Sequence, residues 1–536
     1  MNRKERRSVM AIKTFKRILL ITSSLVLATG LLAGCGAKND VSIPDVGRAT
    51  EKYAEFMPKG SEILAYVEDL ANLDMRQSGA AGGVQAQEYI MDKFNEYGLE
   101  DVHVIPTETD LWTCDDWTLQ VEGQTIDSYR MYMSLFDGKY GEGGELKANA
   151  EGVVSKDNGV YGTFSTSDKG NVEDAEIIYI ESLEQLEETD PAEVKGKVVV
   201  SNIKSRYAEP LEYYYAQAYG AVGFVGILKE YFDSNKYNPE DMSYVNGSFL
   251  IPGYYVTKKD GDKIIDLIAE AENREEAAQA HFEMTVNVER TDKAGAVVGI
   301  LPGKSDGDGK MIMMESHYDA TTPDGATQDA SGCSVVLALA KFYSQIPQEE
   351  RERGILFVLN DTHSSDYDAH DNVNKEYLGG EWIEEEACCV PGINETDVLA
   401  VLGIEHISEE AVIEDNELKF TGNVSEHYTF VADSPEMMQI VTDETANLQD
   451  AKETGIATVQ KAEAIVTDAD LFWYDGWGIP VVSMISHQPY MFDDCDTIDK
   501  VPERALKPVT ESFANIIWKF MSLDESCFDI PKPEEE

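Results

Sequence analysis

The chain has 536 residues, which is more than one average domain holds, and 43% of them are hydrophobic, enough for ordinary cores. Its 100 Asp and Glu residues against 44 Lys and Arg residues give a formal net charge of −56. From the length we expect two or more domains. A surface this acidic repels phosphate backbones, so we expect no nucleic-acid partner.

The first 34 residues have the pattern of an export signal. A basic region is followed by a mostly apolar stretch at residues 18–32, which is short for a membrane-spanning helix. The motif Leu-Ala-Gly-Cys at its end resembles the bacterial lipobox. The resemblance implies a lipid on Cys35 that anchors the exported chain to the outer face of the bacterial cell membrane, with residues 35–50 as a polar tether. The alternatives are a plain signal peptide and a retained anchor.

Residues 51–149 are predicted to form the N-terminal part of the main domain. Apolar residues recur with helical spacing through residues 51–99, interrupted by a loop at residues 75–79. Strands are predicted at residues 102–105 and around residues 117–121.

Residues 150–292 are predicted to form a separate domain inserted into the main one. Gly-Lys-Val-Val-Val at residues 196–200, Ala-x-x-x-Gly-Ala-Val-Gly-Phe at residues 216–224, and Ile-Pro before a strand at residues 251–256 resemble the β-rich protease-associated (PA) domain. That domain usually carries no catalytic residues. No cluster of His and carboxylate residues at ligand spacing occurs in this part of the sequence.

The segment from residue 311 to residue 370 alternates strands and polar loops around one helix. An apolar run at residues 311–314 leads to His317, a turn-rich loop with Asp329 follows, and residues 335–342 have helical spacing. A second apolar run at residues 355–359 leads to His363. This order predicts an α/β fold, a mostly parallel sheet with helices on both faces and with polar side chains at the carboxyl ends of its strands.

The main domain is predicted to continue over residues 293–524. A strand at residues 398–404 ends in Glu405, and a further strand is expected at residues 479–485. The sequence contains neither a Gly-x-Ser-x-Gly elbow nor a His-Glu-x-x-His helix, so other hydrolase chemistries are poorly supported. The imidazole nitrogens and carboxylate oxygens at the strand ends are ligands that suit zinc. Residues 525–536 are expected to be a disordered tail.

Several segments together resemble the M28 zinc peptidases, which are mostly aminopeptidases with a co-catalytic zinc pair. The matching segments are Arg76-Gln77-Ser78-Gly79, His317-Tyr318-Asp319, Gln328-Asp329-Ala330-Ser331-Gly332, residues 399–405, Gly478-Ile479-Pro480 and residues 496–501. The resemblance covers nearly all of the mature chain if the PA-like unit is an insertion. It implies zinc as the cofactor and a peptide or protein as the substrate.

The resemblance also implies roles for four residues. His317 matches the first histidine ligand, Asp329 the bridging carboxylate and Glu405 an acidic ligand at a strand end, and together they form one three-ligand half-site. Asp319 is implied to orient an imidazole beside the metal. Each residue has a structural alternative: His317 as a hydrogen-bonded loop histidine and Asp329 as a helix cap. For Glu405 the alternative is a solvated loop acid, and for Asp319 it is a turn-capping residue.

The second half-site departs from the family pattern. The family has a Glu-Glu pair after the strand at residues 355–359, as general base and ligand, whereas this chain has Asp-Thr-His-Ser at residues 361–364. His363 is therefore expected to act as the base or as a ligand. The family's last His ligand falls on Phe492, with His487, Asp493 and Asp494 nearby. One zinc site is supported, and a second is in doubt.

Three hypotheses follow from these residues. The first is an exported, lipid-anchored M28-like metallopeptidase that hydrolyses peptide bonds with zinc-activated water. The second is a binding lipoprotein that keeps the fold and has lost hydrolysis, which the missing Glu-Glu pair favours. The third is a cyclase-like transferase on the same fold.

Overall fold

The structure is a computed structural model that describes most of the chain after residue 41. The described residues are 42–132, 134–135, 146–148, 154–156, 164–165, 171–203, 211–237, 250–361, 363, 397–463, 466–470 and 478–530. The predicted export signal, Cys35 and the end of the predicted tail lie outside these ranges. Within them, no helix has both the length and the apolar character that crossing a membrane requires.

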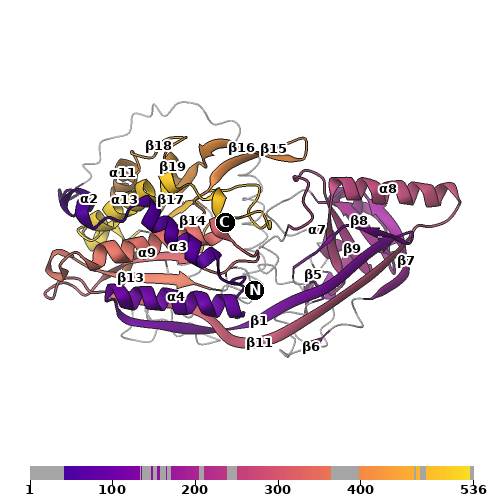
Figure 1. Cartoon of the computed structure of the whole chain (residues 1–536), viewed down its shortest axis with the longest axis horizontal. Coiled ribbons are helices and arrows are strands. Elements are labelled where there is room, and N and C mark those ends of the chain that lie inside the picture. The colour runs from indigo at the N-terminus through magenta and orange to yellow at the C-terminus, as the bar shows by residue number, and fades with distance from the viewer. Residues whose placement is uncertain are drawn as a thin grey trace.

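Four parallel strands form the centre of the lobe on the left of Figure 1. They are β12 (Met311–His317), β13 (Gly354–Asn360), β14 (Val398–Glu405) and β20 (Val481–Ile485). Strand β12 pairs with β13 on one side and with β14 on the other, and β14 pairs with β20. Because these strands run in one direction, their carboxyl ends meet at one edge of the sheet. The predicted α/β fold with a mostly parallel sheet is confirmed.

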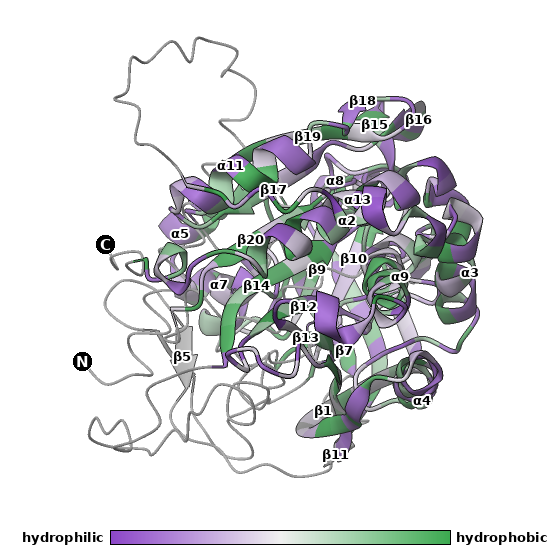
Figure 2. Ribbon diagram, turned by 90° about the vertical axis from the view of Figure 1, so that its left-hand side faces the viewer, coloured by the Kyte–Doolittle hydropathy of each residue, from purple (hydrophilic) through white to green (hydrophobic). Residues whose placement is uncertain are grey.

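Both faces of these strands are buried, which explains their continuous apolar runs. In β12, Ile312 and Met314 face the cluster that includes the helices, whereas Met313 faces a second apolar cluster. The helices of the first cluster are α3 (Gly60–Ala71), α4 (Ala81–Tyr97), α9 (Ser331–Ser344), α11 (Pro435–Glu444) and α13 (Glu503–Phe520). Figure 2 shows the central strands in green and hydrophilic purple residues on the helices around them.

A second lobe, on the right of Figure 1, contains a smaller parallel sheet. Its strands, in spatial order, are β7 (Val172–Ile180), β8 (Val198–Asn202), β9 (Gly223–Leu228) and β10 (Gly253–Thr257), with β3 (Tyr129–Arg130) antiparallel to β10. Its helices are α5 (Leu183–Glu188), α6 (Pro191–Val194), α7 (Leu211–Ala218) and α8 (Lys258–Asn273). The lobe has an apolar core of its own, which also takes in Trp112 and Met131 from before residue 150. Its likeness to a PA domain stays a prediction.

A long two-stranded ribbon joins the two lobes (Figure 1). Strand β1 (Glu100–Val121) pairs antiparallel with β11 (Gln279–Leu301), and the register shifts at three points along the pair. Two separate strands were expected within β1; the structure joins them, because such irregularities let a long strand bend without leaving its partner. Strand β11 also pairs with β13 in the first lobe and with β7 in the second.

Further strands extend the first lobe beyond β20. Strand β17 (His427–Val431) pairs antiparallel with β20 and in parallel with β19 (Gly455–Lys461). A hairpin of β15 (Glu409–Glu414) and β16 (Glu417–Val424) follows β14 closely. It therefore leaves the sheet next to the end of β14, where Glu405 lies.

Candidate metal centre

Three side chains with metal-binding atoms converge at the carboxyl edge of the parallel sheet. His317 ends β12, Glu405 ends the adjacent strand β14, and His406 follows Glu405 directly. Their ligand atoms all lie within 4.8 Å of one another, and all three side chains are buried. Among the residues that the structure describes, this is the group of His, Cys, Asp and Glu side chains that lies close enough to hold one metal ion.

Both imidazoles are held in the tautomer that a metal ligand needs. Nδ1 of His317 lies 3.1 Å from the Asp319 carbonyl oxygen and 3.3 Å from Asp319 Oδ1. Nδ1 of His406 donates to the Ser486 carbonyl oxygen at 3.2 Å. Because each Nδ1 faces an acceptor, Nε2 is the ring atom of each histidine that is left to bind a metal ion. Both Nε2 atoms are buried without a hydrogen-bond partner in the described ranges.

Glu405 is fixed at one carboxylate oxygen and faces the histidines with the other. Oε1 accepts a hydrogen bond from the Asp468 backbone N–H at 2.9 Å, and Oε2 lies 3.9 Å from His406 Nε2. Two imidazole nitrogens and one carboxylate oxygen form a ligand set known from catalytic zinc sites, which keep a fourth position for water or substrate. The three side chains therefore fit a zinc ion.

The charges of the group also favour a cation. Burial, and after it the charge of Asp468, raise the pKa of Glu405 well above its usual range. Burial, and after it the charge of His317, hold the pKa of His406 well below its usual range. Burial and His363 lower the pKa of His317, but the hydrogen bond to Asp319 and the charge of Asp329 outweigh them, so that this pKa is raised to about 10. The site thus holds protons where a metal ion would bind instead.

Asp329, the predicted bridging ligand, lies beside this group but is not one of its three members. Its Oδ2 accepts from Ser316 Oγ at 2.5 Å, and its Oδ1 accepts from the backbone N–H groups of Gly332 and His406 at 3.0 Å each. The bond to Gly332, in the first turn of α9, agrees with the helix-capping alternative. The bond to His406 fixes the backbone of one member of the group.

Asp319 lies where a residue that orients His317 should lie. Its Oδ1 and its carbonyl oxygen both face Nδ1 of His317. Its Oδ2 accepts a hydrogen bond from Ser78 Oγ at 3.2 Å, so the loop between α3 and α4 holds the carboxylate from the other side. Asp319 thus links the N-terminal helices to the ring of His317.

His363 packs against the group without belonging to it. Its ring stacks on the ring of His317, with centroids 4.0 Å apart and planes inclined by 8°. Its Nδ1 shares a short hydrogen bond with Oδ1 of Asp468, the residue whose backbone N–H also holds Glu405. Because Nδ1 faces a carboxylate, Nε2 is the ring atom of His363 that can accept a proton. The neighbouring residues 362 and 364 lie outside the described ranges.

The residues near the predicted last ligand have other contacts. Phe492 is buried in the core of the second lobe. Asp493 accepts a hydrogen bond from Ser234 Oγ at 2.5 Å, and Asp494 lies 3.5 Å from Nζ of Lys236. The ring of His487 lies 6.4 Å from that of His406, outside the group of three. These carboxylates contact the second lobe, and the described residues do not assemble a second metal site there.

Sequence reasoning missed His406 as a possible ligand. The only available signal was its position, directly after a strand-end acid. Successive side chains of an extended strand point in opposite directions, so Glu405 and His406 would not be expected to face one metal. His406 has a φ of 59°, in the left-handed region, which ends the extended geometry and lets both side chains face one point.

One segment of the chain matches the model of a known protein family. The model of peptidase family M28 matches residues 296–364, which contain β12, α9, β13 and the two stacked histidines. The comparison with curated proteins gave no match.

The fold is similar to that of several solved peptidases. The chain resembles the Peptidase M28 precursor from Shewanella amazonensis with a TM-score of 0.59 and 17% identity, over 91% of this chain and 99% of that one. It resembles BSAP, a zinc aminopeptidase from Bacillus subtilis, with a TM-score of 0.57 and 13% identity, over 87% and 96%. At such identities the likeness shows the fold alone. Together with the matched segment, it supports the prediction that the chain is a metallopeptidase.

Proposed function

We propose that the chain is an exported, lipid-anchored metallopeptidase that hydrolyses peptide bonds outside the cell, as an aminopeptidase-like enzyme with one zinc ion held by His317, Glu405 and His406. The observation that carries this proposal is the convergence of two unpartnered Nε2 atoms and one carboxylate within 4.8 Å, at the strand ends of a peptidase-like fold. The export and anchoring part rests on the lipobox-like motif at Cys35.

Each part of the site has a task in this reaction. When bound, zinc in such a three-ligand site polarises a peptide carbonyl and lowers the pKa of a water molecule. His363 is the residue placed to take the proton of the attacking water at Nε2 and to pass it to the leaving amine. Asp468 holds the Nδ1 proton of His363 and stabilises the charged ring that forms. Asp319 keeps the ring of His317 in its orientation.

A binding lipoprotein without hydrolysis is the second candidate. It is favoured by the absence of a glutamate pair after β13, where the sequence reads Asp-Thr-His-Ser. On this view His317, Glu405 and His406 hold a metal that fixes the fold or a ligand, and His363 only packs against them.

The deciding experiment is zinc stoichiometry together with peptidase activity of the full-length chain in detergent. We expect about one zinc per chain by elemental mass spectrometry after dialysis against trace zinc. We also expect hydrolysis of a peptide panel that a chelator abolishes and zinc restores. One bound zinc without hydrolysis would favour the binding lipoprotein. No zinc at micromolar free metal would remove the metallopeptidase.

A further inference from the structure

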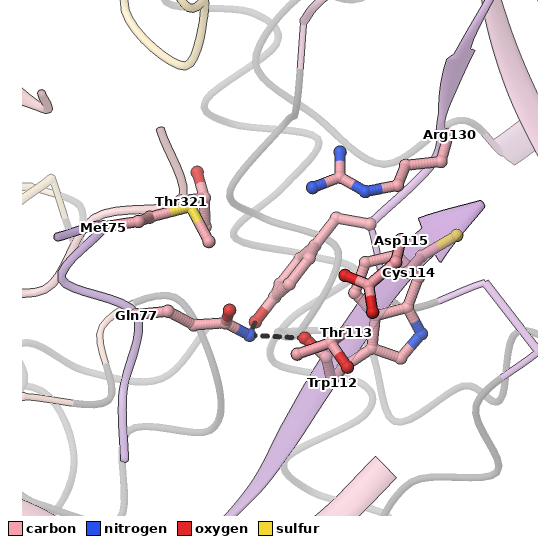
Figure 3. A pocket seen from close by; sticks show the side chains of 9 residues that line it. Met75, Gln77, Trp112, Thr113, Cys114, Asp115, Arg130 and Thr321 are labelled. Carbon is pink, nitrogen blue, oxygen red and sulfur yellow. Dashed lines mark hydrogen bonds between the residues drawn. The ribbon is translucent and has the colours of Figure 1, made fainter. Parts of the chain in front are cut away.

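A pocket opens at the junction of the two lobes, close to the candidate metal centre. It has a volume of about 100 Å³, roughly that of three water molecules in the liquid. The side chains that line it are Met75, Gln77, Trp112, Thr113, Cys114, Asp115, Arg130, Tyr132 and Thr321 (Figure 3). Arg130 comes from β3 of the second lobe, whereas Met75, Gln77 and Thr321 come from loops of the first. Both lobes therefore build the pocket.

The pocket lies beside the residues that hold His317. Gln77 precedes Ser78, whose hydroxyl donates to Asp319, and Thr321 follows Asp319 by two residues. Gln77 also ties the two lobes together, because its Nε2 donates to the Trp112 carbonyl oxygen at 2.7 Å (Figure 3). The chain segments that orient His317 therefore also contribute residues to this pocket.

Two hydrogen-bond donors of Arg130 have no partner among the residues that the structure describes. Its Nε and Nη1 atoms are buried, although the residue as a whole is half-buried, and they donate no hydrogen bond to any described residue. No described carboxylate forms an ion pair with it either, although the chain carries 100 acidic residues. A buried charged donor without a partner is costly, so such a group is expected to have a ligand.

Three aromatic rings lie around the guanidinium group of Arg130. Its central carbon lies 4.5 Å from the ring centroid of Tyr129, 5.4 Å from that of Trp117 and 5.6 Å from that of Trp112. Rings at these distances attract the positive charge of a guanidinium, and a carboxylate binds such a group in its plane through its N–H groups. In Figure 3 the side chain of Arg130 extends from its strand into the pocket. The rings therefore pack around the guanidinium group, while Arg130 still lines the pocket.

We infer that this pocket binds a carboxylate group of the substrate peptide through the guanidinium group of Arg130, and so gives the enzyme a preference for peptides with an acidic group near the scissile bond. The inference rests on the proposed peptidase function for its substrate and on the pocket itself for its chemistry. The carboxylate comes either from an acidic side chain or from the free C-terminus of a short peptide. The net charge of the chain is −56, which repels both, so Arg130 supplies a positive charge at the pocket that offsets this repulsion locally. Asp115 is exposed at the same pocket, where water screens its charge.

A binding experiment on the zinc-free full-length chain in detergent tests the pocket without hydrolysis. Three probes separate the sources of the carboxylate: N-acetyl-glutamate amide, with a side-chain carboxylate only; N-acetyl-leucine, with a main-chain carboxylate only; and N-acetyl-leucine amide, with none. We expect one of the first two to bind about 10- to 100-fold tighter than the third in calorimetric titration. Equal affinities for all three probes would overturn the inference.

Variants assign the effect to Arg130. We expect Arg130→Gln to abolish the difference between the probes. Arg274→Gln, which removes an exposed arginine of the same lobe paired with Glu122 and Glu276, should preserve it. If Arg130→Gln does not fold, Arg130→Lys is the second test of the pocket. Lysine keeps the positive charge but lacks the planar guanidinium group with its several N–H donors. We expect Arg130→Lys to bind at least fivefold more weakly than the native chain, and unchanged affinity would refute the role of Arg130.

Peptide hydrolysis by the zinc-loaded chain separates this inference from the proposed function. Carboxylate binding without hydrolysis would leave the pocket assigned and remove the peptidase. If the chain hydrolyses peptides, we expect kcat/KM for the preferred acidic peptide to fall at least tenfold in Arg130→Gln, relative to the matching neutral peptide. Hydrolysis with no such change would leave the peptidase and remove the pocket from substrate recognition.

Discussion

Replacing His406 with alanine tests the metal centre most directly, because the resemblance to known peptidases does not assign this residue. The structure places its Nε2 in the group with His317 and Glu405, whereas the sequence analysis put Asp329 in the third position. The two arrangements predict opposite outcomes for two substitutions, His406→Ala and Asp329→Asn.

The expected loss of affinity follows from the number of ligands. Structural zinc sites with four ligands bind with about 10–16 kcal/mol, so one ligand contributes about 3 kcal/mol, or a factor of about 100 in Kd. His406→Ala should show this full loss of zinc affinity. The hydrogen bond to Ser486 already orients the native ring, and after its removal no other side chain has to rearrange into the site. The cost to folding should be small, about 1 kcal/mol for that hydrogen bond.

Asp329→Asn should lower the free energy of unfolding more than it lowers zinc affinity, the reverse of His406→Ala. The Asp329 carboxylate accepts three hydrogen bonds, two of them from backbone N–H groups, and asparagine keeps only one acceptor oxygen. We expect a loss of about 2–4 kcal/mol in the free energy of unfolding. Zinc affinity should fall by only about tenfold, the lower end of the range for residues that support a ligand.

Competition titration with a chromophoric chelator, together with thermal unfolding of the metal-free chains, measures both quantities. His487→Ala is the matched control, because its ring is the next histidine, 6.4 Å from His406, and does not belong to the group. The reasoning is refuted if His406→Ala keeps native zinc affinity, or if Asp329→Asn loses zinc completely while its unfolding temperature is unchanged.

Three further outcomes are expected. His317→Ala should abolish zinc binding, and an unchanged metal content would remove this residue from the site. His363→Ala should reduce turnover far more than metal content; equal losses would instead make His363 a ligand. Burial lowers the pKa of His427 to about 4, so between pH 6.5 and 4 only the unfolded chain binds this proton. The free energy of unfolding should therefore fall with falling pH by up to about 1.4 kcal/mol per unit, and His427→Gln should lack this contribution in unfolding titrations.

The parallel strands and their polar ends were predictable from the sequence because burial on both faces requires a recognisable run of apolar residues. Strands covered on both faces must be apolar at every position, which made β12, β13 and β14 visible as short continuous runs. Since parallel strands end at one edge, His317 and Glu405 could be expected to meet. The structure places both in one group.

The role of His406, the position of Arg130 and the length of β1 depend on backbone geometry that the residue types alone do not predict. His406 joins the group through a left-handed backbone conformation, which is uncommon for residues other than glycine and is not announced by the residue type. Arg130 reaches the pocket through a two-residue strand paired with β10, and nothing in its local sequence separates it from an ordinary surface arginine. The length of β1 was underestimated because its three register shifts break the regular alternation of apolar residues.

The ribbon of β1 and β11 has a consequence for the thermodynamics of the whole molecule. Strand β11 is hydrogen-bonded to β13 beside the metal-bearing sheet and to β7 in the other lobe, so one strand belongs to the sheets of both. Neither lobe can lose that strand without breaking the paired backbone of its neighbour. The metal centre and the distant lobe should therefore melt as one cooperative unit, so that a metal ion bound at His317 stabilises strands far beyond its own ligands.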